Sequence, residues 1–196
     1  TYTNNITLTV PNQIVVSPTV SSNWNGANIS CFGASDGEVT VTTSGGVQPH
    51  TVLWDDDNSS STNTISNLVS RTYTATITDE NGCIKIADIT LVDPPLLEVD
   101  LDVRDSLTFN VSCFGVCDGW ALATPHGGTT GISGVYTYSW SDGQLSSLAE
   151  GLCAGATYTV TVTDSVGCVV DTTFMIAQMI YGCTDSISCN YNSQAN

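Results

Sequence analysis

A strict alternation of apolar and hydroxyl side chains marks one stretch of the chain as a β-strand. Tyr73, Ala75 and Ile77 alternate with threonines along residues 72–78, and a period of two places the apolar side chains on one face of a strand. The following Asp-Glu-Asn-Gly predicts a tight reversal, and Cys83 comes directly after it. The stretch therefore predicts a half-buried strand, a turn and an anchor for a disulfide.

The same pattern occurs twice in the chain. Residues 72–83 (TYTATITDENGC) and 157–168 (TYTVTVTDSVGC) share eight of twelve residues. The features that recur in the same order elsewhere are Cys31 and Cys113, Gly45 and Gly127, and Trp54 and Trp140. Their offsets differ by a few residues, as expected for insertions confined to loops. The sequence is therefore a tandem repeat.

The repeat predicts the domain boundaries. Ile6-Thr7-Leu8 recurs as Ile89-Thr90-Leu91, which closes the first repeat. By this logic residues 1–11 are the closing strand of a preceding repeat, and the sequence is cut from a longer array. Because a lone strand leaves its backbone groups unpaired, residues 2–10 are either disordered or paired with a sheet edge of another molecule, and we favour the second. The first repeat then spans 12–95, the second 96–181, and a cysteine-containing tail 182–196.

The pattern favours an all-β fold of two tandem immunoglobulin-like antiparallel β-sandwiches stapled by disulfides. We count about seven strands in the first repeat and no credible segment of helical period. We expect the central tryptophan of each repeat to be buried. The residues predicted to pack around them are Leu68, Tyr73 and Ile77 for Trp54, and Leu152, Tyr158 and Val162 for Trp140.

Composition narrows the classes of partner. Nineteen acidic residues against three basic ones give a net charge of −16, so nucleic acid and anionic membrane surfaces are poor partners. There is no run of eighteen apolar residues, so no membrane insertion is predicted. Eight cysteines in two small domains indicate disulfides and an oxidising, extracellular location.

Comparison of the two repeats predicts the disulfide pairs. Because Cys31 and Cys83 have counterparts in the second repeat, each repeat is expected to close on itself. Two further cysteines occur only in the second repeat and are expected to pair with each other, which leaves two in the tail. The predicted bonds are Cys31–Cys83, Cys113–Cys168, Cys117–Cys153 and Cys183–Cys189. The alternative is free thiols that perform redox chemistry.

The combined motifs resemble the SprB repeat of bacterial cell-surface adhesins. The first repeat carries SCFGASDG, GG, LW, NL and TYTATITDENGC, and the second carries SCFGVCDG, GG, YTYSW and LCAGATYTVTVTD. The tail YGCTDSISCNYNSQAN resembles a GCTD-type motif found near the C-terminal end of such proteins. The resemblance implies a giant, repetitive protein of the cell surface, exported by type IX secretion and linked to gliding motility.

One catalytic pattern is formally present. Residues 33–37 (GASDG) match G-x-S-x-G, but a nucleophile elbow needs a following helix and a downstream His and acid. The second repeat has Cys117 at the position of Ser35. The two histidines, His50 and His126, stand at non-equivalent positions. No enzymatic activity is therefore predicted.

Calcium is the only cofactor for which the sequence offers ligands. Carboxylate oxygens are the donors that calcium prefers, and the candidates are Asp55, Asp56, Asp57, Glu98, Asp100 and Asp102. The second repeat offers only Asp142 at the place of the aspartate run. Runs of charge are also common in solvated loops that bind nothing.

The resemblance also implies O-glycosylation at Asp-Ser/Thr-apolar sequences. Four matches place the modified residue at Ser106, Ser165, Thr172 and Ser186. About two matches would arise in a chain of this composition by chance.

The function predicted from these observations is a structural and adhesive repeat segment of a large secreted adhesin or extracellular filament. Its partners would be neighbouring repeats, surface glycans or other copies in a filament. One alternative is a calcium- or carbohydrate-binding module, which would expose aromatic side chains. Trp24 and Trp120 lie outside the shared framework and are the candidates. A second alternative is the stalk of a secreted enzyme.

Overall fold

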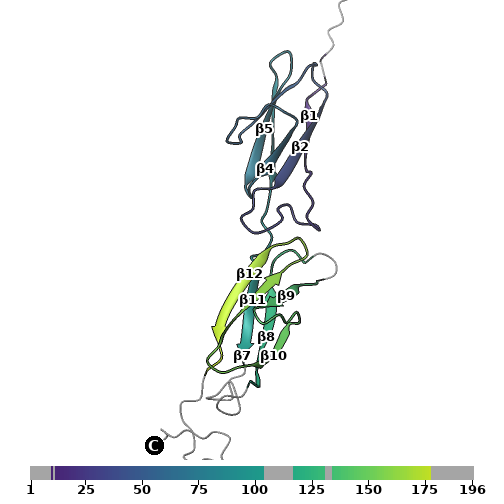
Figure 1. Ribbon diagram of the computed structural model, residues 1–196. Coiled ribbons are helices and arrows are strands. Elements are labelled where there is room, and N and C mark those ends of the chain that lie inside the picture. Colours follow the sequence, from purple (N-terminus) through teal and green to yellow (C-terminus); the bar gives the residue numbers. More distant parts are fainter. Residues whose placement is uncertain (1–9, 11, 104–116, 131–133, 178–196) are drawn as a thin grey trace, which may run out of the picture. The chain divides into compact units, whose positions relative to one another are not determined.

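The computed structural model describes residues 10, 12–103, 117–130 and 134–177. Regular secondary structure in these ranges consists of β-strands, paired antiparallel throughout. Across the same ranges no helix is long and apolar enough to cross a membrane. The chain divides between Pro94 and Pro95 into two compact units, called unit 1 and unit 2 below (Figure 1).

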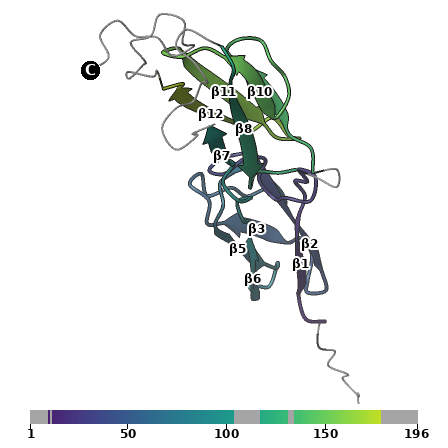
Figure 2. The ribbon, with the colours of Figure 1, turned by 90° about the horizontal axis from the view of Figure 1, so that it is seen from below.

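Unit 1 contains six strands within its described residues, one fewer than the approximate count from sequence. They are β1 (Val15–Val20), β2 (Gly37–Ser44), β3 (Thr51–Trp54), β4 (Thr64–Leu68), β5 (Thr72–Thr78) and β6 (Ile84–Thr90). They form two sheets, in the orders β1-β2-β4 and β3-β5-β6, which lie on opposite sides of unit 1 in Figure 2. This is the A-B-E and C-F-G arrangement of an immunoglobulin domain without strand D.

Unit 2 repeats this topology. Its strands are β7 (Glu98–Val103), β8 (Gly119–His126), β9 (Thr137–Trp140), β10 (Leu148–Leu152), β11 (Thr157–Thr163) and β12 (Val169–Met175). The sheets are ordered β7-β8-β10 and β9-β11-β12. The predicted fold class, tandem immunoglobulin-like antiparallel sandwiches, is therefore confirmed.

Side chains from both sheets of each unit meet in one core. In unit 1, Val39 and Val41 of β2 pack in the same cluster as Trp54 of β3 and Ile77 of β5. The tryptophans are 2% and 3% exposed in unit 1 and unit 2. Each indole N–H donates to a backbone carbonyl, that of Thr62 at 2.9 Å and that of Ser146 at 2.8 Å. This hydrogen bond satisfies the one polar group that burial of a tryptophan brings into the core.

The predicted companions of the two tryptophans also belong to these cores. Leu68, Tyr73 and Ile77 are buried around Trp54, and Leu152 and Val162 around Trp140. Tyr158 is only partly buried and packs against Phe174, with ring centroids 6.0 Å apart. The core predictions are thus confirmed, with Tyr158 at the margin of its core.

The strand directions define two ends of unit 1. The proximal end holds residues 12–14, where Asn12 accepts a hydrogen bond from Gly46, and the turn between β5 and β6. The distal end holds residues 91–93, where the Leu91 side chain reaches Gly37 at the start of β2. The predicted strand at residues 2–10 falls almost wholly outside the described residues.

Candidate functional site

The repeated motif Thr-Asp-x-x-Gly-Cys forms a turn organised by its aspartate. In unit 1, Asp79 Oδ1 accepts hydrogen bonds from the N–H groups of Asn81 (3.0 Å) and Cys83 (2.8 Å). Its Oδ2 accepts one from Val47 N–H at 3.1 Å, which ties the turn to the loop after β2. The hydrogen bond from Cys83 is the main reason that the pKa of Asp79 lies below its ordinary value. Asp79 is only 6% exposed.

Unit 2 reproduces this turn bond for bond. Asp164 Oδ1 accepts from Val166 N–H (3.0 Å) and Cys168 N–H (2.9 Å), and Oδ2 accepts from Thr129 N–H (2.7 Å). The repeated motif is therefore an architectural device, because its carboxylate is fully engaged by backbone donors.

The repeated Gly-Gly pair explains how the turn aspartate comes so close to the backbone of the loop after β2. Gly45 and Gly46 have φ angles of 71° and 56°, a region that favours glycine. A Cβ on Gly45 would stand 2.0 Å from the carbonyl oxygen of Gln13, and one on Gly46 would stand 3.1 Å from Asp79 Oδ2. The two glycines thus let the backbone after β2 pass between residues 12–14 at the proximal end and Asp79.

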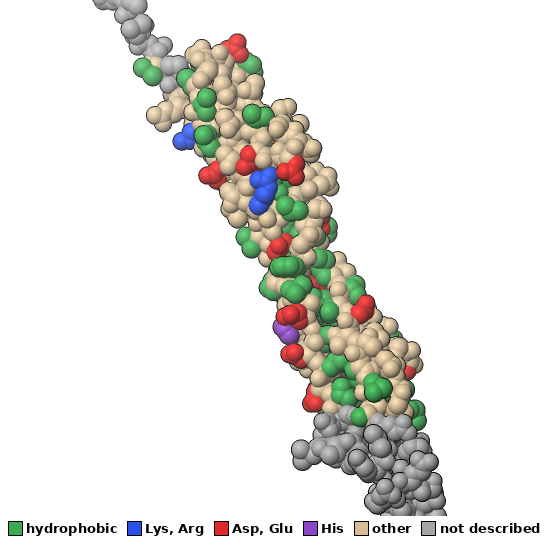
Figure 3. Space-filling model, turned by 90° about the vertical axis from the view of Figure 1, so that its left-hand side faces the viewer, with side chains coloured by type: hydrophobic (Ala, Val, Ile, Leu, Met, Phe, Trp, Pro, Cys, Tyr) green, Lys and Arg blue, Asp and Glu red, His purple; other side chains and the backbone are tan. Residues whose placement is uncertain are grey.

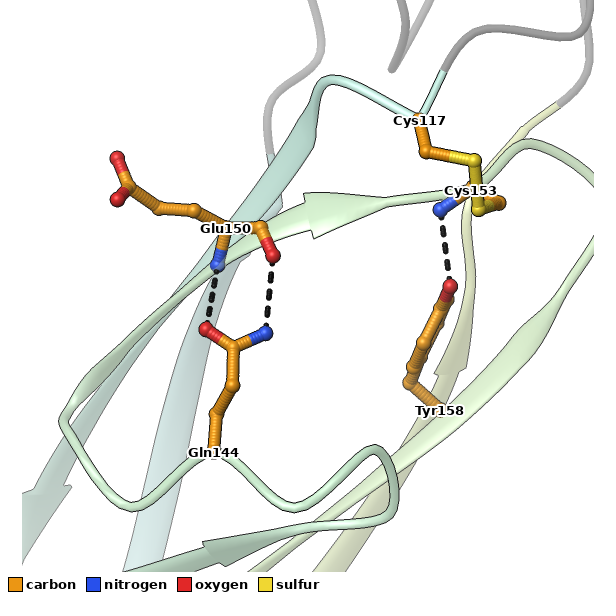
Figure 4. Close-up of a disulfide and its surroundings, with 5 residues drawn as sticks. All are labelled: Cys117, Gln144, Glu150, Cys153 and Tyr158. Carbon is orange, nitrogen blue, oxygen red and sulfur yellow. Dashed lines mark hydrogen bonds between the residues drawn. A yellow bond between two sulfur atoms is a disulfide. The ribbon is translucent and has the colours of Figure 1, made fainter.

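A disulfide joins Cys117 to Cys153 in unit 2, as predicted, with a sequence separation of 36 residues. Cys117 lies two residues before the start of β8, and Cys153 directly follows the end of β10 (Figure 4). The N–H of Cys153 donates to the hydroxyl of Tyr158 at 2.8 Å. The Gln144 side chain, in the loop before β10, accepts a hydrogen bond from the N–H of Glu150 on β10 and donates one to its carbonyl. The disulfide and the Tyr158 contact therefore hold the turn between β10 and β11, and the Gln144 contacts hold the loop between β9 and β10.

The predicted bond between Cys31 and Cys83 is wrong. Cys83 is a free, exposed thiol, whereas Cys31 is disulfide-bonded. Cys31 lies two residues before Gly33, whose N–H donates to Asp93 at the distal end, and Cys83 lies at the proximal end. The length of β5 separates the two ends by about 20 Å, and a disulfide requires Cα atoms within about 7 Å of each other.

The other disulfide predictions remain predictions. Cys168 is disulfide-bonded, but its predicted partner Cys113 lies outside the described residues, as do Cys183 and Cys189.

The three consecutive aspartates do not converge. Asp55 lies 3.6 Å from Arg71 and accepts from Thr74 N–H. Asp56 accepts from the N–H and the hydroxyl of Ser60, at 2.6 and 2.7 Å. Burial, the largest single cause, raises the pKa of Asp56, but the hydrogen bonds that its carboxylate accepts, first those from Ser60, together outweigh it, and the pKa lies below its ordinary value. Asp57 is exposed.

The three carboxylates of β7 share its outer face, and two of them flank a histidine. Glu98 Oε2 lies 3.2 Å and Asp100 Oδ2 lies 3.7 Å from the His126 ring, and Asp102 is exposed. Within the described ranges, no group of three His, Cys, Asp or Glu side chains is arranged to hold a metal ion. The structure therefore does not bring the proposed calcium ligands together in either place.

The G-x-S-x-G match does not form a nucleophile elbow. Gly37, its last residue, begins strand β2, where the elbow requires a helix. Of the four glycosylation candidates, Ser106 and Ser186 lie outside the described residues. Ser165 is exposed and its hydroxyl donates to Thr129 at 2.6 Å, while Thr172 is partly buried within β12.

A partly exposed apolar patch lies on the outer face of sheet β7-β8-β10. We call it the tryptophan face. A shallow hollow of about 280 Å³ is lined by Trp120, Leu122, Leu148 and Glu150. In the strand register Leu122 stands between Asp102 and Leu148, and Glu150 stands beside Trp120. Carboxylates therefore border the apolar side chains on both sides.

Unit 1 has hydroxyl side chains where unit 2 has the tryptophan face. Thr40 stands between Thr19 and Thr64 in the register of β1-β2-β4. The hydroxyls of Thr40 and Thr64 are 2.9 Å apart, and the Thr19 hydroxyl donates to Thr40 O. Such a face satisfies its own polar groups. Of these two matched faces, the tryptophan face is the one with apolar surface that a ligand can cover.

Sequence reasoning found Trp120 but missed its two leucine neighbours. Leu122 interrupts an alternation that the repeat fills with threonine, and this departure was the available signal. The other aromatic candidate, Trp24, is partly buried and forms an isolated antiparallel β-bridge with Ala27.

Two segments of the chain match the SprB repeat, residues 25–59 and 108–145. The chain matches no curated protein. Among solved structures it is similar to an amphioxus IgVJ-C2 molecule, with 12% identity, coverage of 68% of this chain and 91% of that one, and a TM-score of 0.31. It is also similar to Dpr2 Ig1-Ig2 in complex with DIP-Theta Ig1-Ig3, with 10% identity, 82% and 66% coverage, and a TM-score of 0.25.

Proposed function

We propose that this chain is a structural and adhesive repeat segment of a large secreted cell-surface adhesin or filament. The observation that carries the proposal is that both units contain an SprB match, and that their shared motifs all serve architecture. The aspartate turn, the Gly-Gly pair and the central tryptophan hold each sandwich together. Type IX secretion and a part in gliding motility belong to the same proposal.

The surface of the two units suits a passive spacer. It is dominated by uncharged polar side chains and backbone on the face shown in Figure 3, with scattered acidic residues and very few basic ones. The chain carries three Lys and Arg residues and a net charge of −16. Excess charge of one sign keeps a protein soluble and discourages self-association. In unit 2 the Cys117–Cys153 loop adds about 4 kcal/mol of stability in the chain-entropy model.

The tryptophan face is our candidate for the adhesive contact, with a neutral glycan as its ligand. The apolar side of a sugar ring packs on an indole, while neighbouring carboxylates accept hydrogen bonds from its hydroxyls. Trp120 and Leu122 supply the first kind of contact, and Glu150 and Asp102 the second. The same carboxylates and the net charge disfavour anionic polysaccharides.

Surface exposure is the first test. An antibody raised against residues 12–177 should stain intact source cells, and external protease should remove the signal before the cells lyse. Staining that appears only after permeabilisation contradicts the proposal.

The glycan contact is tested by giving unit 2 the side chains of unit 1. The triple variant Trp120→Glu, Leu122→Thr, Leu148→Thr keeps strand-compatible residues at all three positions. Beads coated with the unaltered chain should adhere to neutral polysaccharide surfaces, and the triple variant should lose at least ten-fold in retained beads. Thr40→Leu on unit 1 is the matched control and should change nothing. Equal retention of the triple variant would remove the tryptophan face from the proposal.

A further inference from the structure

Cys83 and Cys168 occupy the same position of the same turn but differ in covalent state. The N–H of each donates to Oδ1 of the turn aspartate, at 2.8 and 2.9 Å. Cys168 is disulfide-bonded and 8% exposed, whereas Cys83 is a free, exposed thiol. The turn therefore carries a disulfide in unit 2, and this identifies the matched position in unit 1 as a site for the same covalent link.

The partner of Cys83 does not come from its own unit. The other cysteine of unit 1, Cys31, is itself disulfide-bonded and lies at the distal end. About 20 Å of strand β5 separates the two residues. A sandwich as rigid as an immunoglobulin domain does not bring its opposite ends together, so the link has to reach another unit.

The surroundings of Cys83 form a surface suited to a second polypeptide. A hollow of about 410 Å³ is lined by Cys83, Asp79, Ile84 and Lys85 together with residues of the proximal segment, Val10, Asn12, Gln13 and Ile14. Val10 is 90% and Ile84 63% exposed. Exposed apolar side chains grouped around a concave surface are typical of contact sites. The chain runs into unit 1 at this end, so a domain attached before residue 12 would lie beside the thiol.

We propose that Cys83 forms a disulfide with the Cys31-type cysteine of another repeat, and so links repeats end to end. The Cys31-type position lies at the distal end of its sandwich and the Cys83-type position at the proximal end. Repeats arranged head to tail therefore bring these two positions together. The partner repeat is one that precedes unit 1 in a longer chain, because Cys31 of a second copy of this chain is itself disulfide-bonded. This choice of partner rests on one part of the proposed function, namely that the chain belongs to an array of repeats. It does not depend on the adhesive role.

The link is formed by two thiol–disulfide exchanges with a disulfide oxidant, either a low-molecular-weight disulfide or a disulfide oxidoreductase. The partner cysteine thiolate first attacks the oxidant and forms a mixed disulfide, releasing one thiol. The Cys83 thiolate then attacks the partner's sulfur in that mixed disulfide and displaces the second thiol. Two cysteine thiols are oxidised, the oxidant disulfide is reduced to two thiols, and the two protons pass to those thiols.

Peptide mapping of the native surface protein tests the proposal. Free thiols are first alkylated with N-ethylmaleimide, and the protein is digested without reduction. We expect the Cys83 peptide to be joined to a cysteine peptide of the S-C-F-G type. Quantitative alkylation of Cys83, or a bond between Cys83 and Cys31, would overturn the inference.

A non-reducing gel tests the source of the partner. A link to a preceding repeat leaves the apparent mass unchanged on reduction and yields a peptide from outside residues 1–196. A doubled mass that collapses on reduction would show a link between two copies and would overturn the choice of partner. A protein that fails the surface-staining test but shows the crosslink would contradict the proposed function alone. A stained protein with alkylated Cys83 would contradict this inference alone.

A matched pair of variants separates linkage from folding. In the 196-residue chain Cys83→Ser should leave the melting temperature of unit 1 within 1 °C of the unaltered chain, because the thiol is free, while abolishing maleimide labelling of its peptide. Cys168→Ser, at the matched position, should lower the melting temperature of unit 2 by about 4 °C or more. A comparable loss from Cys83→Ser would show that Cys83 serves the stability of its own unit and would contradict the inference.

Discussion

The hydroxyl of Tyr73 donates a 3.0 Å hydrogen bond to the backbone carbonyl of Val69. Tyr73 stands near the start of β5, and its bond closes the turn from β4, as the tyrosine corner does in immunoglobulin-like domains. In unit 2 the matched tyrosine, Tyr158, accepts from Cys153 N–H instead. Both units therefore fasten the same turn with the same residue, although the hydroxyl donates in one and accepts in the other.

Removing either hydroxyl should destabilise its unit. We expect Tyr73→Phe to lower the free energy of unfolding of unit 1 by about 1–2 kcal/mol, because the Val69 carbonyl loses its partner in a partly buried site. Tyr158→Phe should cost unit 2 a similar amount. Urea denaturation of the two variants is the measurement. No change in either midpoint would mean that the turn is held by backbone contacts alone.

Truncating the core tryptophans should have a larger effect. Trp54→Ala or Trp140→Ala should lower the free energy of unfolding of the affected unit by about 3–5 kcal/mol, because a large cavity replaces a fully buried ring. Trp54→Phe retains most of the apolar volume and loses the hydrogen bond to Thr62, so we expect a smaller loss. Chemical denaturation followed by circular dichroism measures both. A cost below about 1 kcal/mol for Trp54→Ala would contradict the core assignment.

The turn aspartate should make unit 1 sensitive to acid. The pKa of Asp79 is lower in the folded than in the unfolded state, since backbone donors stabilise the carboxylate. Its contribution is therefore fully present above the unfolded pKa, which is about 4, and is lost as the pH falls through the lower folded pKa. Asp79→Asn should reduce the difference in unfolding free energy of unit 1 between pH 7 and pH 3.

The exposed Asp57 supplies the control for this titration. Asp57→Asn should leave the pH dependence of unit 1 as it is in the unaltered chain. An Asp79→Asn profile that runs parallel to the unaltered one from pH 7 to pH 3 would contradict the role given to Asp79.

The disulfide of unit 2 should be a local reinforcement. The double variant Cys117→Ser, Cys153→Ser should destabilise unit 2 by up to about 4 kcal/mol, because the 36-residue closed loop no longer restricts the unfolded chain. Unit 1 has Ser35 at the position matched to Cys117, and its transition should not move. Calorimetry of the intact chain measures both transitions. Equal shifts in both units would show that the bond does not act within unit 2 alone.

Features that depend on neighbouring residues or on comparing the two repeats were predictable from the sequence. The alternation of Tyr73, Ala75 and Ile77 with threonines determines β5, because side chains on a strand alternate between its two faces. The burial of Trp54 and Trp140 was predictable from their matched positions in the two repeats. The Cys117–Cys153 bond was predictable because both residues are extra to the second repeat.

Tertiary structure alone decided the features that depend on strand direction and register. Cys31 and Cys83 lie at opposite ends of unit 1 because β2 and β5 each cross the sandwich once. The presence of matching cysteines in both repeats does not reveal at which end of the sandwich each cysteine lies. Leu122 and Leu148 join Trp120 only through the register of β8 with β10. The three aspartates of residues 55–57 do not converge, because successive carboxylates accept hydrogen bonds from different donors. Spacing along the chain specifies none of these directions, since each is set by how distant strands pair and pack.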